Sequence, residues 1–575
     1  ETVMEQLSGQ DAMFLYGEMD NTPMHIGPVL IYDPSTAPDG IVRFKDILRT
    51  FQERLHRSPV FTRKLMNVPL GIDHPFWVDD PNTDVEFHVR HIALPKPGDW
   101  RQFCIQIARL HARALDRAHP LWEAYIIEGL DNIPDLPKGS FAMFLKIHHA
   151  AMDGATGVEI MGALHDLSPT ATVNPPSGKR KRAAAAPGEL QLLRKVAGSV
   201  LRQPFGLVRM LGEAVPVWRR VQEGKKEKRF RSLGDKERTR FNARVSPHRV
   251  FGAVNFDLPS VIAIKNSVPG ATVNDVMMTI VAGAMRAYLK GKDELPAKSL
   301  VTGAPVNVRT DEEKTSGGNV VSMMSIALRT DVAAPLARLQ AVHEEAVGSK
   351  AYMNAVGART LTDWSNRLPA QVTALGFRAA SATGLLSTTK PVFNTIITNV
   401  PGPQVPLYMA GARLVRSFGA GPCMDGNGLF QVVTSYAGQI AISFQSCRDM
   451  MPDPDEYEAC LAQSFAELKD ASVKLGTAAT RSDGAKTIKR KGAKARTRAA
   501  RIEALGSVGT KTAGKAKVAA GTKKSGRGKS AAATGTAKSV RAAGAAKSAG
   551  VTKRSVAKRA ASAPTRARKP ARKAR

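Results

Sequence analysis

The stretch that decides the fold is residues 141–154, which read Phe-Ala-Met-Phe-Leu-Lys-Ile-His-His-Ala-Ala-Met-Asp-Gly. Its first seven residues form a largely apolar run, which is typical of a buried β-strand. Two histidines follow at once, and apolar residues at helical spacing come after the glycine: Val158, Met161 and Leu164. A strand that leads through polar residues into a helix predicts a mixed α/β (α+β) fold. The end of such a strand is a rigid mount for a catalytic side chain.

The second histidine of this stretch, His149, is the candidate general base. An imidazole titrates near neutral pH, so it can take a proton from an alcohol that attacks an acyl group. Ala150 and Ala151 are small enough to let a substrate approach. Asp153 stands four positions on, where it either orients the ring or anchors the loop through a basic partner. Two alternatives remain open: a pair of buried, hydrogen-bonded histidines, and a metal site, for which no further ligand stands nearby in sequence.

A covalent nucleophile is not indicated by the sequence. No Gly-x-Ser-x-Gly elbow occurs, and no cysteine stands in a recognisable nucleophile context. This favours direct transfer to the acceptor over an acyl-enzyme. The four cysteines are widely spaced and form no Cys-x-x-Cys pair, so they predict neither a disulfide framework nor a zinc site, and favour a reducing, cytosolic setting.

Composition divides the chain into four parts. Residues 1–174 and 241–475 alternate strand-like and helix-like patterns, which predicts two α/β halves. Residues 175–240 open with Pro-Pro-Ser-Gly-Lys-Arg-Lys-Arg and predict a basic linker, either a crossover helix packed on the body or an amphipathic membrane contact. Residues 476–575 are predicted to be disordered, because a segment of Ala, Lys, Arg, Gly, Ser and Thr buries too little apolar surface to offset its ordering entropy.

Several local patterns predict individual elements within the two halves. Thr272 and Asp275 resemble a capping box, which predicts a helix that starts there and runs through Leu289. Apolar runs and turn residues predict the other elements. They are a strand at 29–32, a helix at 104–115, a strand at 393–398, and a hairpin of strands 431–435 and 439–444 around Ala437-Gly438.

The net charge of +33 belongs to the linker and the tail. Residues 476–575 contain 29 Lys/Arg and 2 Asp/Glu, and residues 175–232 contain 15 and 4, so the remaining parts are slightly acidic. A basic tail predicts contact with an anionic membrane or lipid-droplet surface, or with DNA phosphates. The first residues do not resemble a signal peptide, and no apolar stretch approaches ~18 residues. We therefore expect a cytoplasmic protein that associates peripherally with lipid.

Residues His148 to Gly154 resemble the HHxxxDG motif of CoA-dependent acyltransferases and peptide-synthetase condensation domains. Further matches narrow the resemblance to the bacterial wax ester synthase/diacylglycerol acyltransferase family, over about residues 3–472. These matches are Asp11-Ala12-Met13-Phe14, Met24-His25, His119-Pro120-Leu121-Trp122-Glu123, Asn274-Asp275, Pro305-Val306-Asn307-Val308-Arg309, Gly318-Asn319 and Asn399-Val400-Pro401-Gly402-Pro403. Thr398 stands where the family usually has Ser.

The resemblance implies a two-part fold like that of chloramphenicol acetyltransferase, with the active site in a channel between the halves. It implies that His149 is the base and that His148 packs and positions the motif. Asp153 belongs to the same catalytic set, although in relatives it more often pairs with an Arg, for which Arg309 is our candidate. Asn274, near a helix N-terminus, is implied to stabilise the developing oxyanion. Its alternative role is a hydrogen bond at the helix start.

The other matched residues are implied to bind substrate or to hold the fold. Pro120, Leu121 and Trp122 would line the acyl or acceptor pocket, beside Gly154. The residues with an implied structural role, besides Arg309, are Asp275, Asn399, Pro401 and Gly402.

The function implied by the resemblance is O-acyl transfer from acyl-CoA, with no cofactor. The acceptor would be diacylglycerol or a long-chain alcohol, and the product triacylglycerol or a wax ester. Three alternatives remain open. His148 and Asp153 also match the H-x-x-x-x-D signature of glycerol-phosphate acyltransferases, whose Glu-Gly-Thr-type motif is absent. A condensation domain would come with carrier-protein modules. A non-catalytic member would use the fold to bind lipid or nucleic acid.

Overall fold

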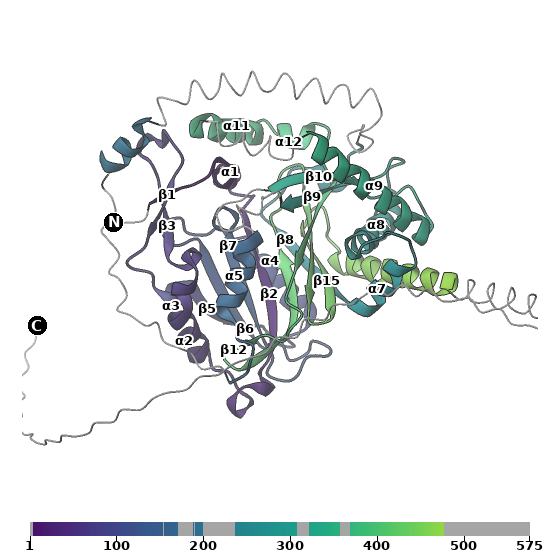
Figure 1. Ribbon diagram of the computed structural model, residues 1–575, viewed down its shortest axis with the longest axis horizontal. Coiled ribbons are helices and arrows are strands. Elements are labelled where there is room, and N and C mark those ends of the chain that lie inside the picture. The colour runs from purple at the N-terminus through teal and green to yellow at the C-terminus, as the bar shows by residue number, and fades with distance from the viewer. Residues whose placement is uncertain are drawn as a thin grey trace, which may run out of the picture. The chain divides into compact units, whose positions relative to one another are not determined.

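The computed structural model describes residues 4–152, 154–170, 188, 190–198, 236–307, 321–356 and 369–476. By contacts the chain divides into Glu1–Gly492 and Ala493–Arg575, and all described residues lie in the first of these units. Asp153, Arg309, most of the predicted linker and nearly all of the predicted tail lie outside the described residues. Two six-stranded sheets form the framework of the first unit (Figure 1).

The first sheet has the order β12-β13-β2-β7-β6-β5, and among its pairings only that of β5 with β6 is parallel. Its strands are β12 (Tyr408–Met409), β13 (Ala412–Ala420), β2 (His25–Asp33), β7 (Phe141–His148), β6 (Trp122–Glu128) and β5 (Val89–Ala93). β7 is buried along its whole length, as its apolar run predicts. Because successive side chains of a strand face opposite sides, Met143 packs with α2 (Phe44–Arg54) and α5 (Gly154–Leu164), and Phe144 packs with α4 (Trp100–His111).

The second sheet has the order β10-β9-β11-β14-β15-β8. Its strands are β10 (Val321–Ala327), β9 (Val301–Asn307), β11 (Thr395–Pro401), β14 (Leu429–Tyr436), β15 (Gln439–Cys447) and β8 (Arg249–Asp257). The largest core of buried residues joins this sheet to four helices. They are α7 (Leu258–Asn266), α8 (Val273–Gly291), α9 (Pro335–Val356) and the helix 454–476.

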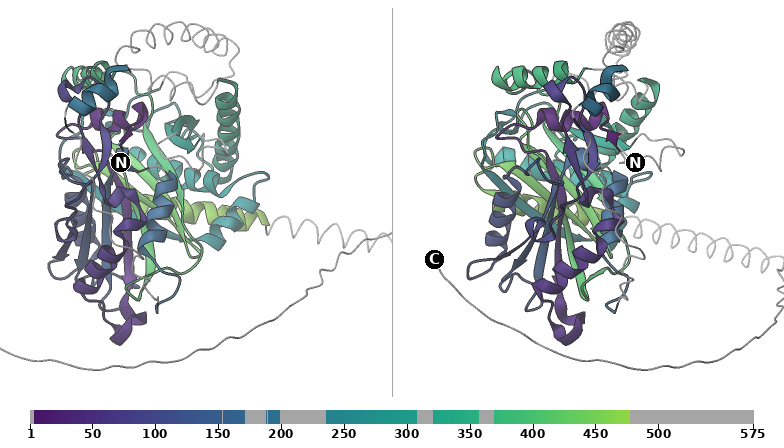
Figure 2. Two further views of the ribbon diagram at one scale, coloured as in Figure 1. Left: turned by 60° about the vertical axis from the view of Figure 1, so that its left-hand side comes forward. Right: turned by 90° about the vertical axis from the view of Figure 1, so that its left-hand side faces the viewer.

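A small three-stranded sheet, α1 (Gly9–Gly17) and α11 (Ala370–Ala382) lie near one end of the unit (Figures 1 and 2). This sheet consists of β1 (Glu5–Gln6), β4 (Phe76–Asp79) and β3 (Arg63–Met66), and α1 follows β1. Other helices are α3 (Val85–His88) and α12 (Leu385–Thr388). Among the residues described, no helix is both long and apolar enough to cross a bilayer.

Two local predictions agree closely with the structure. β14 and β15 form the predicted hairpin, and Ala437 and Gly438 take the positive φ values of 46° and 84° that a two-residue hairpin turn requires. The capping box of α8 is formed as predicted: Thr272 Oγ1 accepts from the Asp275 N–H at 3.2 Å, and the Asp275 carboxylate accepts from the Thr272 N–H at 2.8 Å. The helix itself extends two residues beyond the predicted end, to Gly291.

Other bounds differ from the predictions. The helix predicted at 104–115 is α4, which begins after Asp99, because the Asp99 side chain accepts from the Gln102 N–H at 2.8 Å and caps the helix there. The strand predicted at 393–398 is β11, which runs on to Pro401 in parallel pairing with β14. In addition, β12 and β13 lie in the second half of the sequence but belong to the first sheet, where β13 pairs with β2.

Candidate active site

His149 lies directly after the central strand of the first sheet. β7 ends at His148, and a single turn, η6 (His149–Ala151), follows. The His149 N–H donates to the Met24 carbonyl at 2.8 Å, and the imidazole stacks on Phe14 with ring centroids 3.8 Å apart and planes 9° apart. Burial lowers the pKa of His149 to about 4, and the neighbouring His148 adds to this effect. The ring is therefore neutral at pH 7, which is the form a general base requires.

His148 turns the other way and is completely buried. Its Nδ1 accepts a hydrogen bond from the Ala150 N–H at 3.1 Å, which leaves the ring proton on Nε2. Nε2 lies 3.4 Å from Oε2 of Glu18. His25, the partner of His148 in the β2–β7 ladder, places its own Nε2 3.3 Å from Glu18 Oε1. Two histidines from adjacent strands thus face one carboxylate.

Glu18 is the carboxylate that faces His148 and His25, and its side chain is only 7% exposed. Burial opposes its ionisation, but the close imidazoles of His148 and His25 hold the pKa of Glu18 well below its usual range. Arg117 donates to Oε2 from Nη2 at 2.5 Å and from Nε at 3.1 Å, and the Met24 N–H donates to Oε1 at 3.1 Å. Burial also lowers the pKa of His25 to about 4, so Arg117 supplies the positive charge that balances Glu18.

One short helix supplies both supports of the histidine pair. α1 is capped at its start by Ser8, whose Oγ accepts from the Asp11 N–H at 3.0 Å. The helix carries Phe14 onto His149, and Glu18 follows it directly as its C-cap. Sequence analysis matched Phe14 and His25 to a family motif without a role and missed Glu18. The available signal was a carboxylate just past a helix end, between two motif segments.

Pro120, Leu121 and Trp122 lie beside the site in the first half. The Leu121 carbonyl accepts from the His148 N–H at 3.0 Å, and its side chain packs with Ala150. Trp122 is 0% exposed, donates from Nε1 to the Phe61 carbonyl at 3.1 Å, and stacks on His88 and Phe51. These contacts place Trp122 in the core of the first sheet, and Pro120 and Leu121 are also buried.

The matched residues of the second half form a separate cluster. Asn399 Nδ2 lies 3.4 Å from Asn274 Oδ1, which joins the end of β11 to the start of α8. Asp275 is buried in the capping box and also accepts from His343 Nδ1 at 2.9 Å. Pro401 ends β11, and a side chain at Gly402 would collide with the carbonyl oxygen of Ser435. The hydrogen bonds named above join residues of the second half to one another.

Some expectations about the site fall on residues whose placement is not described. Asp153 lies outside the described residues, as does its expected partner Arg309, and the surroundings of Gly154 are not described. Across the described part of the chain, no group of three or more His, Cys, Asp or Glu side chains is arranged to hold a metal ion.

A cavity of about 510 Å³ lies away from the motif. It is lined by Leu136 and Pro137 before the start of β7, with Asn255, Arg416 and Gln439 from the strands opposite. Because His149 follows the other end of β7, this cavity is not the pocket around the base.

Comparison with known proteins covers nearly the whole described chain. The wax ester synthase/diacylglycerol acyltransferase catalytic domain matches residues 7–277, and the C-terminal domain of the same family matches residues 317–469. A relative from Mycobacterium tuberculosis that carries the name diacylglycerol O-acyltransferase is 30% identical over 453 residues, which are 78% of this chain and 87% of the relative. A similarly named relative from Mycobacterium bovis is 30% identical over 485 residues, covering 81% and 99%.

Solved structures agree with these matches. The wax ester synthase/diacylglycerol acyltransferase from Marinobacter aquaeolei VT8 superposes with a TM-score of 0.56 at 27% identity, over 81% of this chain and 100% of that one. Trichothecene 15-O-acetyltransferase from Fusarium sporotrichioides shares the fold, with a TM-score of 0.51 at 10% identity, over 82% and 96%. The expected two-part acyltransferase fold is thereby confirmed. This chain belongs to the wax ester synthase/diacylglycerol acyltransferase family.

Proposed function

We propose that this protein transfers a fatty acyl group from acyl-CoA to the hydroxyl of diacylglycerol or of a long-chain alcohol, and so forms triacylglycerol or wax esters. The observation that carries the proposal is His149, a neutral imidazole fixed between Phe14 and the Met24 carbonyl at the end of a buried strand. In a member of this family, such a group matches the need for a base that activates a hydroxyl. Acyl-CoA is a substrate in this scheme, and the scheme includes no cofactor.

In the proposed reaction, His149 takes the proton of the acceptor hydroxyl while the hydroxyl oxygen attacks the thioester carbonyl carbon. The C–O bond forms, and negative charge gathers on the carbonyl oxygen. Collapse of this intermediate breaks the C–S bond, and the CoA sulfur receives the proton from His149. Because burial disfavours the imidazolium, His149 passes that proton on readily.

Asn274 is the candidate donor to the developing oxyanion. It stands in the first turn of α8, where the helix N-terminus also favours negative charge. Its Nδ2 lies 3.9 Å from Met278 Sδ, a weak acceptor that a stronger one displaces at little cost. Asp153 and Arg309 stay a predicted pair that holds the motif loop, with no part in relaying charge.

The direct test supplies radiolabelled acyl-CoA with diacylglycerol, a fatty alcohol, monoacylglycerol or no acceptor. We expect labelled triacylglycerol, wax ester, or both, and ~10²-fold less of either from His149→Ala. Release of free fatty acid alone, with every acceptor, would contradict the proposal. The ratio of the two products identifies the preferred acceptor.

Direct transfer makes a separate kinetic prediction. If no acyl-enzyme forms, initial rates at varied acyl-CoA and acceptor give converging lines in double-reciprocal plots, whereas a ping-pong scheme gives parallel lines. Mass spectrometry after mixing with acyl-CoA alone provides the control. An acyl group on any Ser or Cys would contradict direct transfer.

We also propose that the basic residues 476–575 tether the enzyme to an anionic surface and take no part in the reaction. The proposal rests on 29 Lys/Arg against 2 Asp/Glu in this segment. A chain that ends at Gly492 retains the entire first compact unit. It should keep its rate on detergent-dispersed substrate and bind anionic vesicles less at low salt, because most of the tail's charge is removed. Stronger capture of the full chain by DNA than by vesicles would identify nucleic acid as the target.

A further inference from the structure

α11 has apolar side chains on two opposite faces. Its inner face is covered: Ala370 and Thr373 are buried, and Phe377 packs against α1 near Gly17. Its outer face carries a second apolar stripe at spacings of three and four residues. The members of this stripe, all exposed, are Val372, Leu375, Ala379 and Ala382. A helix that is apolar on both faces is normally buried on both, yet among the described residues none covers the outer stripe.

Two neighbouring segments extend this apolar surface. The turn Pro69–Gly71 adjoins α11, since Gln371 Nε2 donates to the Leu70 carbonyl at 3.2 Å. Leu70 is 90% exposed and has a φ of 59°, a conformation that favours Gly, Asn or Asp, so neither core packing nor backbone preference explains a leucine here. The helical stretch 190–198 packs Leu192 against Phe76 behind the same turn and leaves Leu190 63% exposed.

We call this surface the apolar end. Its four large exposed side chains are Leu70, Leu190, Val372 and Leu375, with exposures of 90, 63, 53 and 67%. Both views in Figure 2 show α11 and the stretch 190–198 at the same end of the unit.

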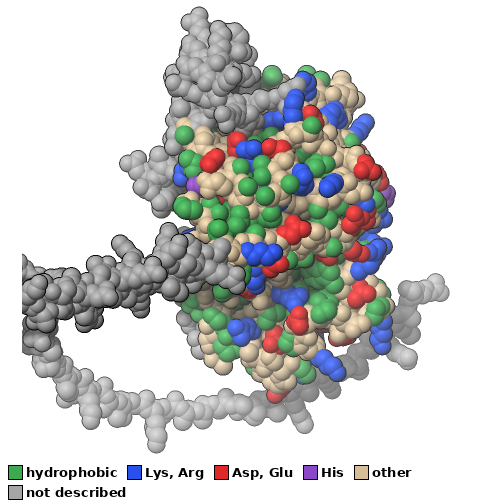
Figure 3. Space-filling model, turned by 90° about the vertical axis from the view of Figure 1, so that its right-hand side faces the viewer, with side chains coloured by type: hydrophobic (Ala, Val, Ile, Leu, Met, Phe, Trp, Pro, Cys, Tyr) green, Lys and Arg blue, Asp and Glu red, His purple; other side chains and the backbone are tan. Residues whose placement is uncertain are grey.

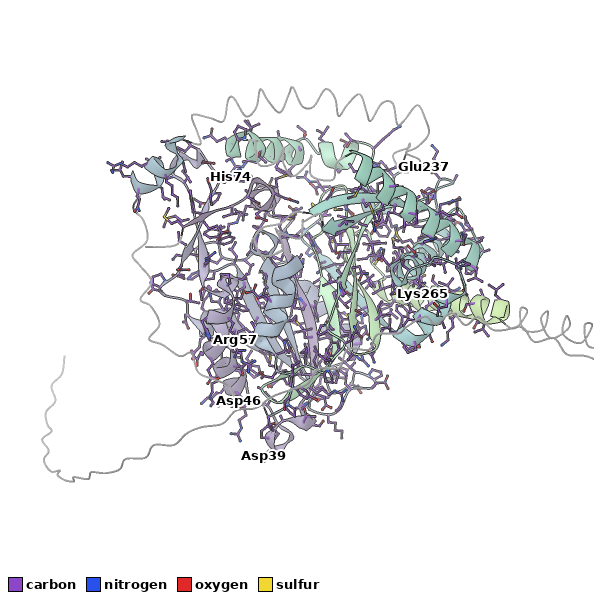
Figure 4. The ribbon with its side chains drawn as sticks, in the orientation of Figure 1. Asp39, Asp46, Arg57, His74, Glu237 and Lys265 are labelled. Atoms are coloured by element: carbon purple, nitrogen blue, oxygen red, sulfur yellow. The ribbon has the colours of Figure 1, made fainter. Side chains whose placement is uncertain are left out.

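In two of the three segments that form the apolar end, all charged residues are basic, whereas the small sheet beside Leu70 also carries the exposed Glu5. The stretches 190–198 and 369–394 contain four Lys/Arg and no Asp/Glu, and Arg194, Lys195 and Arg378 are exposed. Other surfaces differ. The face on the side of α7 and α9 mixes acidic and basic side chains (Figure 3), and the labelled Asp39 and Asp46 lie at the opposite end from α11 (Figure 4). Exposed apolar side chains among cations match the boundary between anionic headgroups and acyl chains.

The apolar end also lies close to the base. α11 packs on α1, and α1 places Phe14 on the ring of His149 at 3.8 Å. A lipid held at the outer face of α11 is therefore two helix layers from the proposed reaction centre. The labelled His74 in Figure 4 marks this end, with Nδ1 3.0 Å from the Tyr16 hydroxyl of α1.

We propose that the apolar end binds an anionic lipid surface, with Leu70, Leu190, Val372 and Leu375 inserted among the acyl chains and Arg194, Lys195 and Arg378 at the headgroups. The inference rests on the proposed function: an acceptor as apolar as diacylglycerol stays in lipid, and this orientation presents the His149 side of the fold to it. The surface is distinct from the basic tail, because it is apolar and belongs to the folded unit.

The test measures sedimentation of the full chain with vesicles of phosphatidylcholine and phosphatidylglycerol, without acyl-CoA. At about 0.5 M salt the screening length falls to ~4 Å, so tail attraction is weak and apolar insertion remains. Leu70→Asp/Leu375→Asp should lower binding by about tenfold or more, because two buried leucines are lost to the lipid. The matched control is Val347→Asp, an exposed valine on α9 that is 57% accessible and should bind like the parent chain.

A second variant tests the charges. In the chain that ends at Gly492, Arg194→Glu/Arg378→Glu should lower binding to phosphatidylglycerol vesicles at about 0.1 M salt by tenfold or more, and should leave binding to phosphatidylcholine vesicles unchanged. Both variants should keep the parent rate on detergent-dispersed substrate and lose rate on acceptor embedded in vesicles.

Binding of Leu70→Asp/Leu375→Asp equal to that of the parent chain would overturn the inference. A change from dimer to monomer in light scattering, or a lower melting temperature, with unchanged vesicle binding would assign the surface to a second copy or to another segment of this chain. If Leu70→Asp/Leu375→Asp loses vesicle binding and the parent chain transfers no acyl group to any acceptor, the lipid-binding surface is supported and the proposed function is rejected.

Discussion

His149 and Asn274 stand in the two halves of the protein and are held in different ways. His149 is fixed by contacts from three elements: the stacked ring of α1, the carbonyl at the start of β2 and the end of β7. Asn274 is held by its position in the first turn of α8, by a 3.4 Å contact with the exposed Asn399 and by a weak 3.9 Å contact with Met278 Sδ. The contrast indicates that His149 is preorganised before substrate binds. Asn274, the proposed oxyanion donor, is held less firmly, and we expect its side chain to move closer to the acyl group when acyl-CoA binds.

The largest expected effect is the loss of turnover when the base is removed. His149→Ala should lower turnover by ~10² or more, the range for removal of a general base. His148→Ala should be milder, because its ring acts through the Ala150 N–H and Glu18. Rates with labelled acyl-CoA and diacylglycerol measure both, and circular dichroism confirms folding. Comparable losses, or a larger loss at His148, would contradict the assignment.

On the other side, Asn274→Ala should lower kcat by about 10², as expected for a lost oxyanion donor. Asn399→Ala should change kcat by less than about threefold, since its contact is long and solvent-exposed. A transition-state role lowers kcat with little change in the KM for acyl-CoA. Equal and small effects at both positions would assign Asn274 to the helix start alone.

Asp153 tests whether the motif loop is held structurally. If Asp153 pairs with Arg309 in a buried site, Asp153→Ala should lower the free energy of unfolding by about 3–5 kcal/mol. Urea denaturation measures the change. An Asp153→Asn variant that keeps its melting temperature but loses activity would instead place Asp153 among the catalytic residues.

A smaller effect is expected at the buried carboxylate. Glu18→Gln turns an amide donor toward Arg117 or His148, so it should lower kcat by about tenfold and stability by about 2 kcal/mol. Glu123→Gln is the matched control, because Glu123 is also a buried carboxylate, paired with Lys146 at 3.0 Å, but does not touch the histidine pair. It should lose stability and keep kcat. Equal losses of kcat in both variants would refute a positioning role for Glu18.

Sequence alone predicted the parts of this fold that depend on neighbours along the chain. β7 follows from seven consecutive residues, the α8 cap from two side chains three positions apart, and the β14–β15 turn from Ala437-Gly438. The order of motifs also identified the family and predicted His149 as its base. Each of these signals lies within one element or one turn.

The rest depends on contacts between distant segments, for which no local pattern exists. Glu18 meets His148 across 130 positions, and only the pairing of β2 with β7 brings His25 beside them. The return of β13 to the first sheet pairs Phe418 with Val29, across 389 positions. The burial of Trp122 likewise depends on distant partners, because its ring packs between Phe51, Phe61 and His88.

The central claim is that a neutral imidazole at His149 takes the proton, and the pH dependence of kcat/KM for the acceptor tests it most directly. With a pKa of about 4, against an ordinary value of 6.5, His149 stays neutral from about pH 5 upward. We therefore predict a plateau from pH 8 to about pH 5 and a fall below it, governed by one proton near pH 4.

Stability needs a parallel control, because His25, His149 and His165 all have pKa values lowered to about 4 by burial. The unfolded chain binds more protons than the folded one between about pH 6.5 and 4, so stability decreases as pH falls through that window. Enzyme held at each pH and returned to pH 7 must regain its full rate. With that control satisfied, a fall with its midpoint near pH 4 supports the account, and a midpoint near pH 6.5 contradicts it.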